Sequence, residues 1–120
     1  VNKAAQALSG GNLQKFIVGR EILQKPRILI VDQPTWGVDV GAATVIRNAL
    51  LKHRGEGAAI VVVSEEIDEL FEVSDRIAVM YRGALSPAVP KKTLTIEEVG
   101  RWMSGLWPDS PFSKTHTEVR

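Results

Sequence analysis

The apolar positions of this chain recur at spacings that predict helices alternating with strands. Between residues 13 and 23 their spacing is roughly helical, and the segment ends before Pro26. The apolar run Ile28–Val31, closed by Asp32, predicts a strand buried on both faces of a parallel sheet. Asp39 is placed to cap the helix that follows. The apolar residues expected on one face of that helix are Ala42, Val45, Ile46, Ala49 and Leu50.

The second half continues the alternation. Ala59–Ser64 predicts a second buried strand, residues 67–71 a short amphipathic helix, and Arg76–Tyr81 a third strand. Thr95 and Glu98 have the spacing of a capping box that opens a last helix. Strands alternating with helices of this size favour an α/β fold with a largely parallel sheet and right-handed crossovers.

Composition narrows the class without naming a function. The chain has 120 residues, of which 44% are hydrophobic and 24% charged, with a formal net charge of +1 and no cysteine. A nearly neutral chain lacks the electrostatic footprint of a nucleic-acid partner. No apolar run approaches the length of a membrane span. We expect one domain over residues 1–107 and, because residues 108–120 are polar with no apolar period, a disordered tail.

Three short segments carry candidate chemistry, and the first stands before the first helix. In Leu8–Lys15, Ser9 is placed to cap a helix, and Gly10 and Gly11 let backbone amides approach a ligand closely. A helix N-terminus with bare amides and a positive dipole favours an anion. For Ser-Gly-Gly taken alone, a capped helix with a flexible entry is the favoured interpretation.

The second and third segments each follow a predicted strand. Asp32 lies where α/β folds bind ligands, and its carboxylate can hold magnesium through water. Many unrelated α/β proteins also end a strand with Asp. The acidic segment Ser64–Glu69 follows the strand Ala59–Ser64. The alternative interpretation of that segment is a solvated helix start, which the helix dipole favours.

In order and spacing these segments resemble the ABC ATPase family, over roughly residues 5–105. The resemblance implies the C-terminal portion of a P-loop NTPase fold, with a mainly parallel sheet flanked by helices. Leu8–Lys15 is similar to the signature motif of sugar and nucleoside importers. The other matching segments are Ile28–Asp32 (Walker B strand), Pro34-Thr35-x-Gly37-x-Asp39 (D-loop), Val61–Leu70 (switch loop) and Ser74–Met80.

Two departures from the family pattern concern catalysis. Gln33 stands where the family has a Glu that polarises the attacking water, and an amide cannot accept a proton near neutral pH. Glu65 stands where the family has a His that contacts the γ-phosphate, and a carboxylate there adds repulsion. With Asp39 of the D-loop, these are the candidate catalytic positions. The resemblance therefore implies a degenerate site.

No segment fits G-x-x-x-x-G-K-[ST], the loop that cradles ATP phosphates, so we expect the chain to be a fragment. In the family two ATPase domains sandwich ATP, each signature serving the other domain. The resemblance thus implies that Ser9, Gly10, Gly11 and Asn12 face nucleotide held by a partner. Asp32, as a magnesium ligand, and Gln33 would face nucleotide held by the domain to which this chain belongs.

The expected function is ATP-powered import of nucleosides or simple sugars by a fused double-ATPase protein at the cytoplasmic face of the inner membrane. Its expected partners are a second ATPase domain, transmembrane permease subunits and a periplasmic or lipoprotein substrate-binding protein, without nucleic acid. Residues 95–105 resemble the nucleoside branch more than the sugar branch, although amphipathic packing explains their spacing well. The alternatives are an ABC ATPase of DNA repair or translation, and a regulatory module without ATPase activity.

Overall fold

The computed structural model describes residues 10–113, and their contacts divide into two compact units between Glu66 and Ile67. This division differs from the single domain expected over residues 1–107. The expectations for Ser9 and for residues 114–120 lie outside the described part of the chain.

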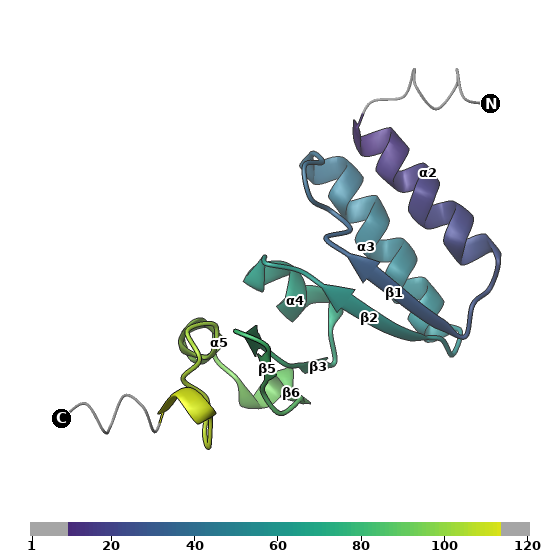
Figure 1. The fold of residues 1–120 in the computed structure, drawn as a ribbon. Coiled ribbons are helices and arrows are strands. Elements are labelled where there is room, and N and C mark those ends of the chain that lie inside the picture. The colour runs from purple at the N-terminus through teal and green to yellow at the C-terminus, as the bar shows by residue number, and fades with distance from the viewer. Residues whose placement is uncertain (1–9, 114–120) are drawn as a thin grey trace. The chain divides into compact units, whose positions relative to one another are not determined.

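The first unit is a two-layer α/β arrangement (Figure 1). Its strands β1 (Ile28–Asp32) and β2 (Ala59–Val63) pair in parallel, with Asp32 opposite Val63. Its helices α2 (Gly10–Leu23) and α3 (Val40–Gly55) lie side by side. The α/β class and this parallel pair are as the sequence predicts, and the register brings both strands to an end at the same edge of the sheet.

One face of this small sheet packs on the helices. The buried residues of that core are Val18, Leu29, Ile46 and Leu50. The face predicted for α3 is partly wrong, because Val45 is exposed whereas Ala43 and His53 are buried. At the C-terminal end of α3, the His53 ring nitrogen Nε2 lies 3.0 Å from the carbonyl oxygen of Pro26, a contact between α3 and the segment before β1.

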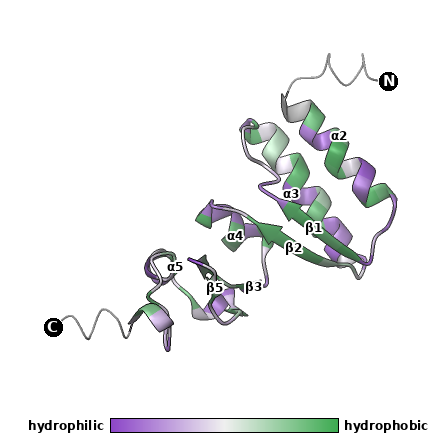
Figure 2. Ribbon diagram, viewed as in Figure 1, coloured by the Kyte–Doolittle hydropathy of each residue, from purple (hydrophilic) through white to green (hydrophobic). Residues whose placement is uncertain are grey.

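The opposite face of the β1–β2 sheet is apolar and open to solvent. The side chain of Ile30 is 68% exposed, and its cross-strand neighbour Val61 is 50% exposed. The expectation of strands buried on both faces is therefore wrong for the described residues. We call this surface the open sheet face. Figure 2 shows that both of its strands are strongly hydrophobic. Its apolar members are Ile28, Ile30, Val61 and Val63.

We expect the 120-residue chain to self-associate through the open sheet face, because parallel sheets are normally covered on both sides. Ile30→Lys places a charge on that face and should shift the chain toward monomer in size-exclusion chromatography with light scattering. Val45→Lys makes a similar change at a comparably exposed valine of α3 and should leave association unchanged. Equal behaviour of the two variants, or a monodisperse wild-type monomer, would contradict the prediction.

The second unit consists of short elements. The strand predicted over residues 76–81 is divided into two, each paired antiparallel with a later strand rather than in parallel. A turn at Arg82 and Gly83, as predicted, joins the pair β4–β5. The bounds are α4 (Ile67–Val73), β3 (Arg76–Ile77), β4 (Met80–Tyr81), β5 (Ala84–Leu85), β6 (Val89–Pro90), a 3-10 turn η1 (Lys91–Thr93) and α5 (Ile96–Trp102).

The helix α5 begins with the predicted capping box. Thr95 Oγ1 accepts a hydrogen bond from Glu98 N at 3.1 Å, and Glu98 Oε1 accepts one from Thr95 N at 3.0 Å. The helix buries Val99 and Trp102 in the core of this unit. The six buried residues of that core are Ile77, Val79, Leu94, Val99, Trp102 and Trp107.

The boundary predicted at residue 107 is wrong for the next six residues. Ser110 is fully buried, and its hydroxyl donates to the carbonyl oxygen of Gly105. Phe112 meets Tyr81 and Trp107 edge to face, with ring centroids 5.0 and 6.2 Å away. Edge-to-face aromatic contacts stabilise such clusters, so residues 108–113 belong to the packed second unit.

Candidate functional site

The glycine-rich segment lies at the start of a helix, as the sequence predicts. The helix α2 begins at Gly10, so Gly10, Gly11 and Asn12 occupy its first turn, directly after Ser9. Backbone amides in a first turn have no partner within the helix. No acidic residue stands in that turn to offset the positive end of the helix dipole. The segment therefore has the backbone arrangement that favours an anionic ligand.

The carboxylate of Asp32 stands at the carboxyl end of β1 and is exposed. Magnesium keeps several waters in proteins and is held by one or two carboxylates together with phosphate oxygens. A single exposed carboxylate at a strand end fits such a site when a nucleotide supplies the phosphates. Among residues 10–113, no group of three or more His, Cys, Asp or Glu side chains is placed to hold a metal ion.

The side chain of Gln33 connects the ends of the two strands. Gln33 has a left-handed backbone (φ 51°), uncommon outside glycine, and its amide N donates to Val63 O at 2.7 Å. Its side-chain oxygen Oε1 lies 3.4 Å from the amide N of Glu65, which donates to it. The sequence suggested a side chain able to orient water. In the structure its oxygen accepts a hydrogen bond from Glu65 N in the loop after β2, and its role toward water stays a prediction.

The loop after β2 is short and acidic. Ser64 Oγ accepts a hydrogen bond from Glu66 N at 3.0 Å, which shapes the turn into α4. The side chain of Glu65 is exposed. The hydrogen bond from its backbone to Gln33 thus brings the candidate positions 33 and 65 together in the first unit. An exposed carboxylate here would repel a phosphate rather than stabilise it.

Two backbone hydrogen bonds stabilise the turn after β1. Trp36 N donates to Gln33 O at 3.1 Å, and Val38 N donates to Thr35 O at 3.3 Å. Thr35 is buried, whereas the indole of Trp36 is 72% exposed. The predicted cap of α3 is confirmed, because Asp39 Oδ1 accepts from Ala42 N at 2.7 Å. The catalytic role of Asp39 stays a prediction.

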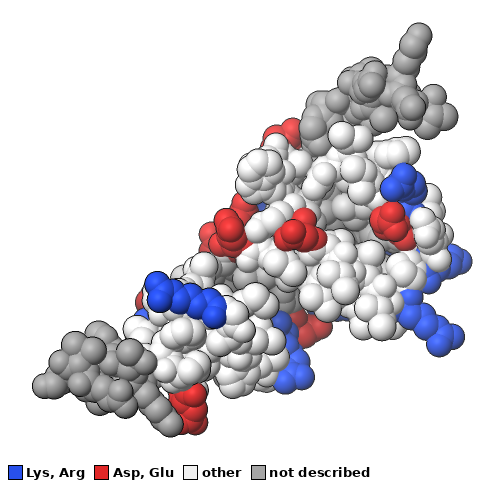
Figure 3. All heavy atoms as spheres, in the orientation of Figure 1, with Lys and Arg blue, Asp and Glu red and all other residues white. Residues whose placement is uncertain are grey.

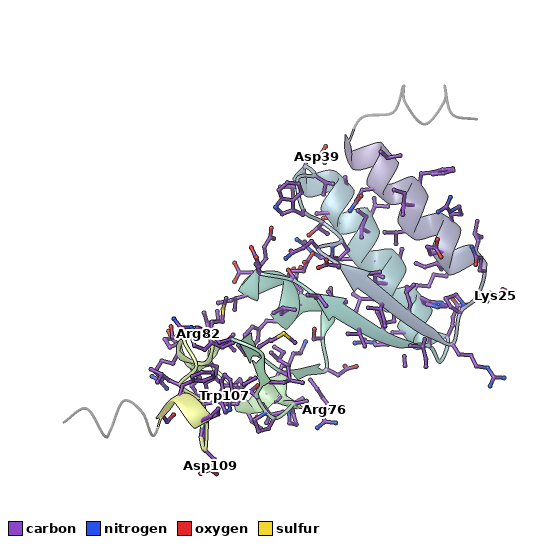
Figure 4. All side chains as sticks on the ribbon, viewed as in Figure 1. Lys25, Asp39, Arg76, Arg82, Trp107 and Asp109 are labelled. Carbon is purple, nitrogen blue, oxygen red and sulfur yellow. The ribbon has the colours of Figure 1, made fainter. Side chains whose placement is uncertain are left out.

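Gln14, to which the sequence analysis assigns no role, lies between two of these segments in the structure. Its Nε2 donates to the carbonyl oxygen of Pro34 at 3.2 Å. Figure 1 shows the start of α2 and the turn after β1 at the same end of the first unit. In Figure 4 Asp39 lies at that end and Lys25 at the other. The sequence carries no local signal for this contact, because the two partners lie twenty positions apart.

Positive charge is spread over the surface in view. Lys and Arg side chains are scattered rather than gathered into one patch on the face drawn in Figure 3. Arg20 and Glu21, both on the outside of α2, form an ion pair with a nitrogen–oxygen distance of 3.3 Å. No helix within residues 10–113 combines the length and the apolarity that crossing a membrane requires.

Known proteins of one class have sequences similar to that of this chain. The chain is 49% identical over 102 residues to the nucleoside import ATP-binding protein NupA of Lactococcus lactis subsp. cremoris, a match that covers 85% of the chain and 20% of NupA. It is 45% identical over 101 residues to the guanosine import ATP-binding protein NupO of Bacillus subtilis, with 84% and 20% covered. The chain thus spans about a fifth of the length of these relatives. No family model matches it.

Solved structures share the fold. A nucleotide-free ATP-binding cassette from an ABC transporter matches with a TM-score of 0.65 and 26% identity, over 82% of this chain and 37% of that one. The dimeric cassette MJ0796 bound to ADP and Pi matches with a TM-score of 0.63 and 29% identity, over 71% and 37%. The fold is therefore that of a part of an ABC ATPase cassette. The chain belongs to the ABC family, and its relatives are the ATP-binding proteins of nucleoside and sugar importers.

Proposed function

We propose that this chain is part of the ATPase of an ABC importer for nucleosides or simple sugars. The observation that carries the proposal is the α2 start, where Gly10–Asn12 offer backbone amides beside the turn that follows Asp32. The identity to NupA and NupO supports the import function. Both nucleoside import proteins and sugar import proteins occur among the relatives, including a glucose import protein of Haloferax volcanii at 47% identity.

The two ATP-facing segments serve different nucleotides in this proposal. Ser9, Gly10, Gly11 and Asn12 face ATP held by a second ATPase domain, so this chain completes the partner's site. Asp32 and Gln33 face ATP held by phosphate-binding residues outside this sequence. The dimeric state of the cassette MJ0796 supports pairing of two such domains.

At the site formed by Asp32, Gln33 and Glu65, nucleotide binding dominates over hydrolysis. Asp32 would hold magnesium, which when bound neutralises charge on the phosphate oxygens. Gln33 cannot take a proton from water near neutral pH, and its side-chain oxygen accepts from Glu65 N. The exposed Glu65 carboxylate adds negative charge where phosphate would lie. These features support a degenerate site whose closure contributes to the conformational cycle.

The remaining partners follow from the import function. Transmembrane permease subunits would receive the motion of the paired ATPase domains, and a periplasmic or lipoprotein substrate-binding protein would deliver the substrate. The ATPase would then act at the cytoplasmic face of the membrane. Reconstitution of the complete transporter in vesicles tests the function: labelled guanosine and ribose are offered with and without Mg-ATP. ATP-driven accumulation of neither compound, nor of related nucleosides and simple sugars, would refute it.

The degenerate site makes a specific prediction for Gln33→Ala in the complete transporter. Loss of a working general base lowers turnover by about a hundred- to ten-thousandfold. Because Gln33 is no base, we expect Gln33→Ala to lower steady-state ATP turnover by no more than about tenfold, the scale of one hydrogen bond. Thr44→Ala, at an exposed position of α3, serves as the control. A fall of a hundredfold with nucleotide binding intact would show that the site hydrolyses ATP.

A further inference from the structure

Gln14 stands where the helix that begins with the glycine-rich segment meets the turn after β1. It lies just beyond the first turn of α2 and is half-buried. Its Nε2 donates to Pro34 O at 3.2 Å across twenty positions of sequence. Pro34 is buried and directly follows Gln33. This hydrogen bond joins the first part of α2 to the backbone next to Gln33.

The hydrogen bonds continue from that turn toward the other strand end. Gln33 N donates to Val63 O at 2.7 Å, and the Gln33 side chain accepts from Glu65 N. The hydrogen bond from Trp36 N to Gln33 O closes the turn after β1. A series of two side-chain hydrogen bonds, joined by the peptide bond between Gln33 and Pro34, thus runs from Gln14 to Glu65. Such a series is a physical route for coupling only if both ends change state together.

We infer that Gln14 is a positioning residue that couples the two ATP sites. This inference rests on the proposed function, in which the start of α2 faces the partner's nucleotide and Gln33 faces the other nucleotide. When the partner's ATP engages Gly10–Asn12, Gln14 transmits the displacement to Pro34, and the turn and the Glu65 loop shift with it. The coupling is reciprocal, because linkage between two binding sites acts in both directions.

Hydrogen exchange with mass spectrometry on the complete transporter tests this inference. Gln14→Met keeps the length of the side chain and good helix propensity but removes the donor. Gln24→Met makes the same change at an exposed position just after α2. The measured quantity is the change in exchange on adding ATP, in peptides covering residues 9–15, 33–39 and 63–67.

In the wild type and in Gln24→Met we expect ATP to slow exchange in all three peptides. In Gln14→Met the response of residues 9–15 should persist, while those of 33–39 and 63–67 fall by about three- to tenfold, the effect of one lost hydrogen bond. If exchange without ATP merely rises while the three responses stay intact, Gln14 is only structural and the inference is overturned. Gln14→Ala, run in parallel, guards against a packing defect specific to Met.

A different outcome separates this inference from the proposed function. If residues 9–15 of the wild type do not respond to ATP at all, the start of α2 does not face a nucleotide. The proposed role of Gly10–Asn12 then fails, and the coupling fails with it. If those residues respond but residues 33–39 respond equally in wild type and Gln14→Met, only the coupling through Gln14 fails.

Discussion

Ser9→Arg should lower ATP turnover of the complete transporter by about a hundredfold or more. In the proposed arrangement Ser9 precedes the first turn of α2, whose backbone amides face phosphate held by the partner domain. The long Arg side chain would occupy the space meant for the phosphate. Removing donors aimed at developing charge costs a comparable factor in other enzymes. Steady-state phosphate release with the membrane partners present is the measurement.

The control for this variant is Ser104→Arg, which adds the same charge at an exposed serine of the second unit. Its turnover should match the wild type. Fluorescent nucleotide binding, measured alongside, separates loss of binding from loss of hydrolysis. Should Ser9→Arg retain more than about a tenth of the wild-type rate, the helix start does not complete a hydrolytic site. Comparison with Gln33→Ala then reports which of the two ATP sites is the active one.

Ile46→Ala should cost about 2–5 kcal/mol of folding free energy, a large share of the stability of a small unit. Ile46 is 1% exposed and lies in the core that joins α3 to the β1–β2 sheet. Removing its side chain beyond Cβ loses burial and leaves a cavity, since cores relax only partially. Urea unfolding of the chain at low concentration, followed by circular dichroism, should show a lower midpoint.

The neighbouring residue provides the control for that measurement. Val45 is 51% exposed on the same helix, so Val45→Ala should change the unfolding free energy by no more than about 0.5 kcal/mol. The sequence pattern had placed both residues on one face. Equally large costs for the two variants would favour that face and contradict the exposure of Val45, whereas equally small costs would contradict the burial of Ile46.

The sequence by itself determined the elements whose signals are local. The capping box at Thr95 and Glu98 and the cap at Asp39 both form as predicted, because a side chain and a backbone amide three residues apart meet whatever the tertiary context. The helix start at Gly10 and the strand ending at Asp32 are likewise as predicted. The family relation could also be read from the sequence, since it depends on the order and spacing of motifs.

Only the tertiary structure decided which surfaces are covered. The apolar run Ile28–Val31 predicts burial, but whether its second face meets a partner depends on segments far away in sequence, and in the described residues that face is open. The region of residues 76–81 predicts a single strand, yet its pairing depends on residues 84–90 and divides it. The polar composition of residues 108–120 likewise gives no sign that Ser110 and Phe112 pack within the second unit.

The hydrogen bonds between segments of the candidate site also depend on the tertiary structure. Nothing in the spacing of Gln14 and Pro34 indicates a hydrogen bond across twenty positions, because it arises where α2 packs beside the sheet edge. The contact between Gln33 and Glu65 depends on the parallel register that sets Asp32 opposite Val63. The sequence determined which chemical groups the site contains, through motifs that are local. The fold decided which of those groups touch, because parallel pairing brings together strand ends that are distant along the chain.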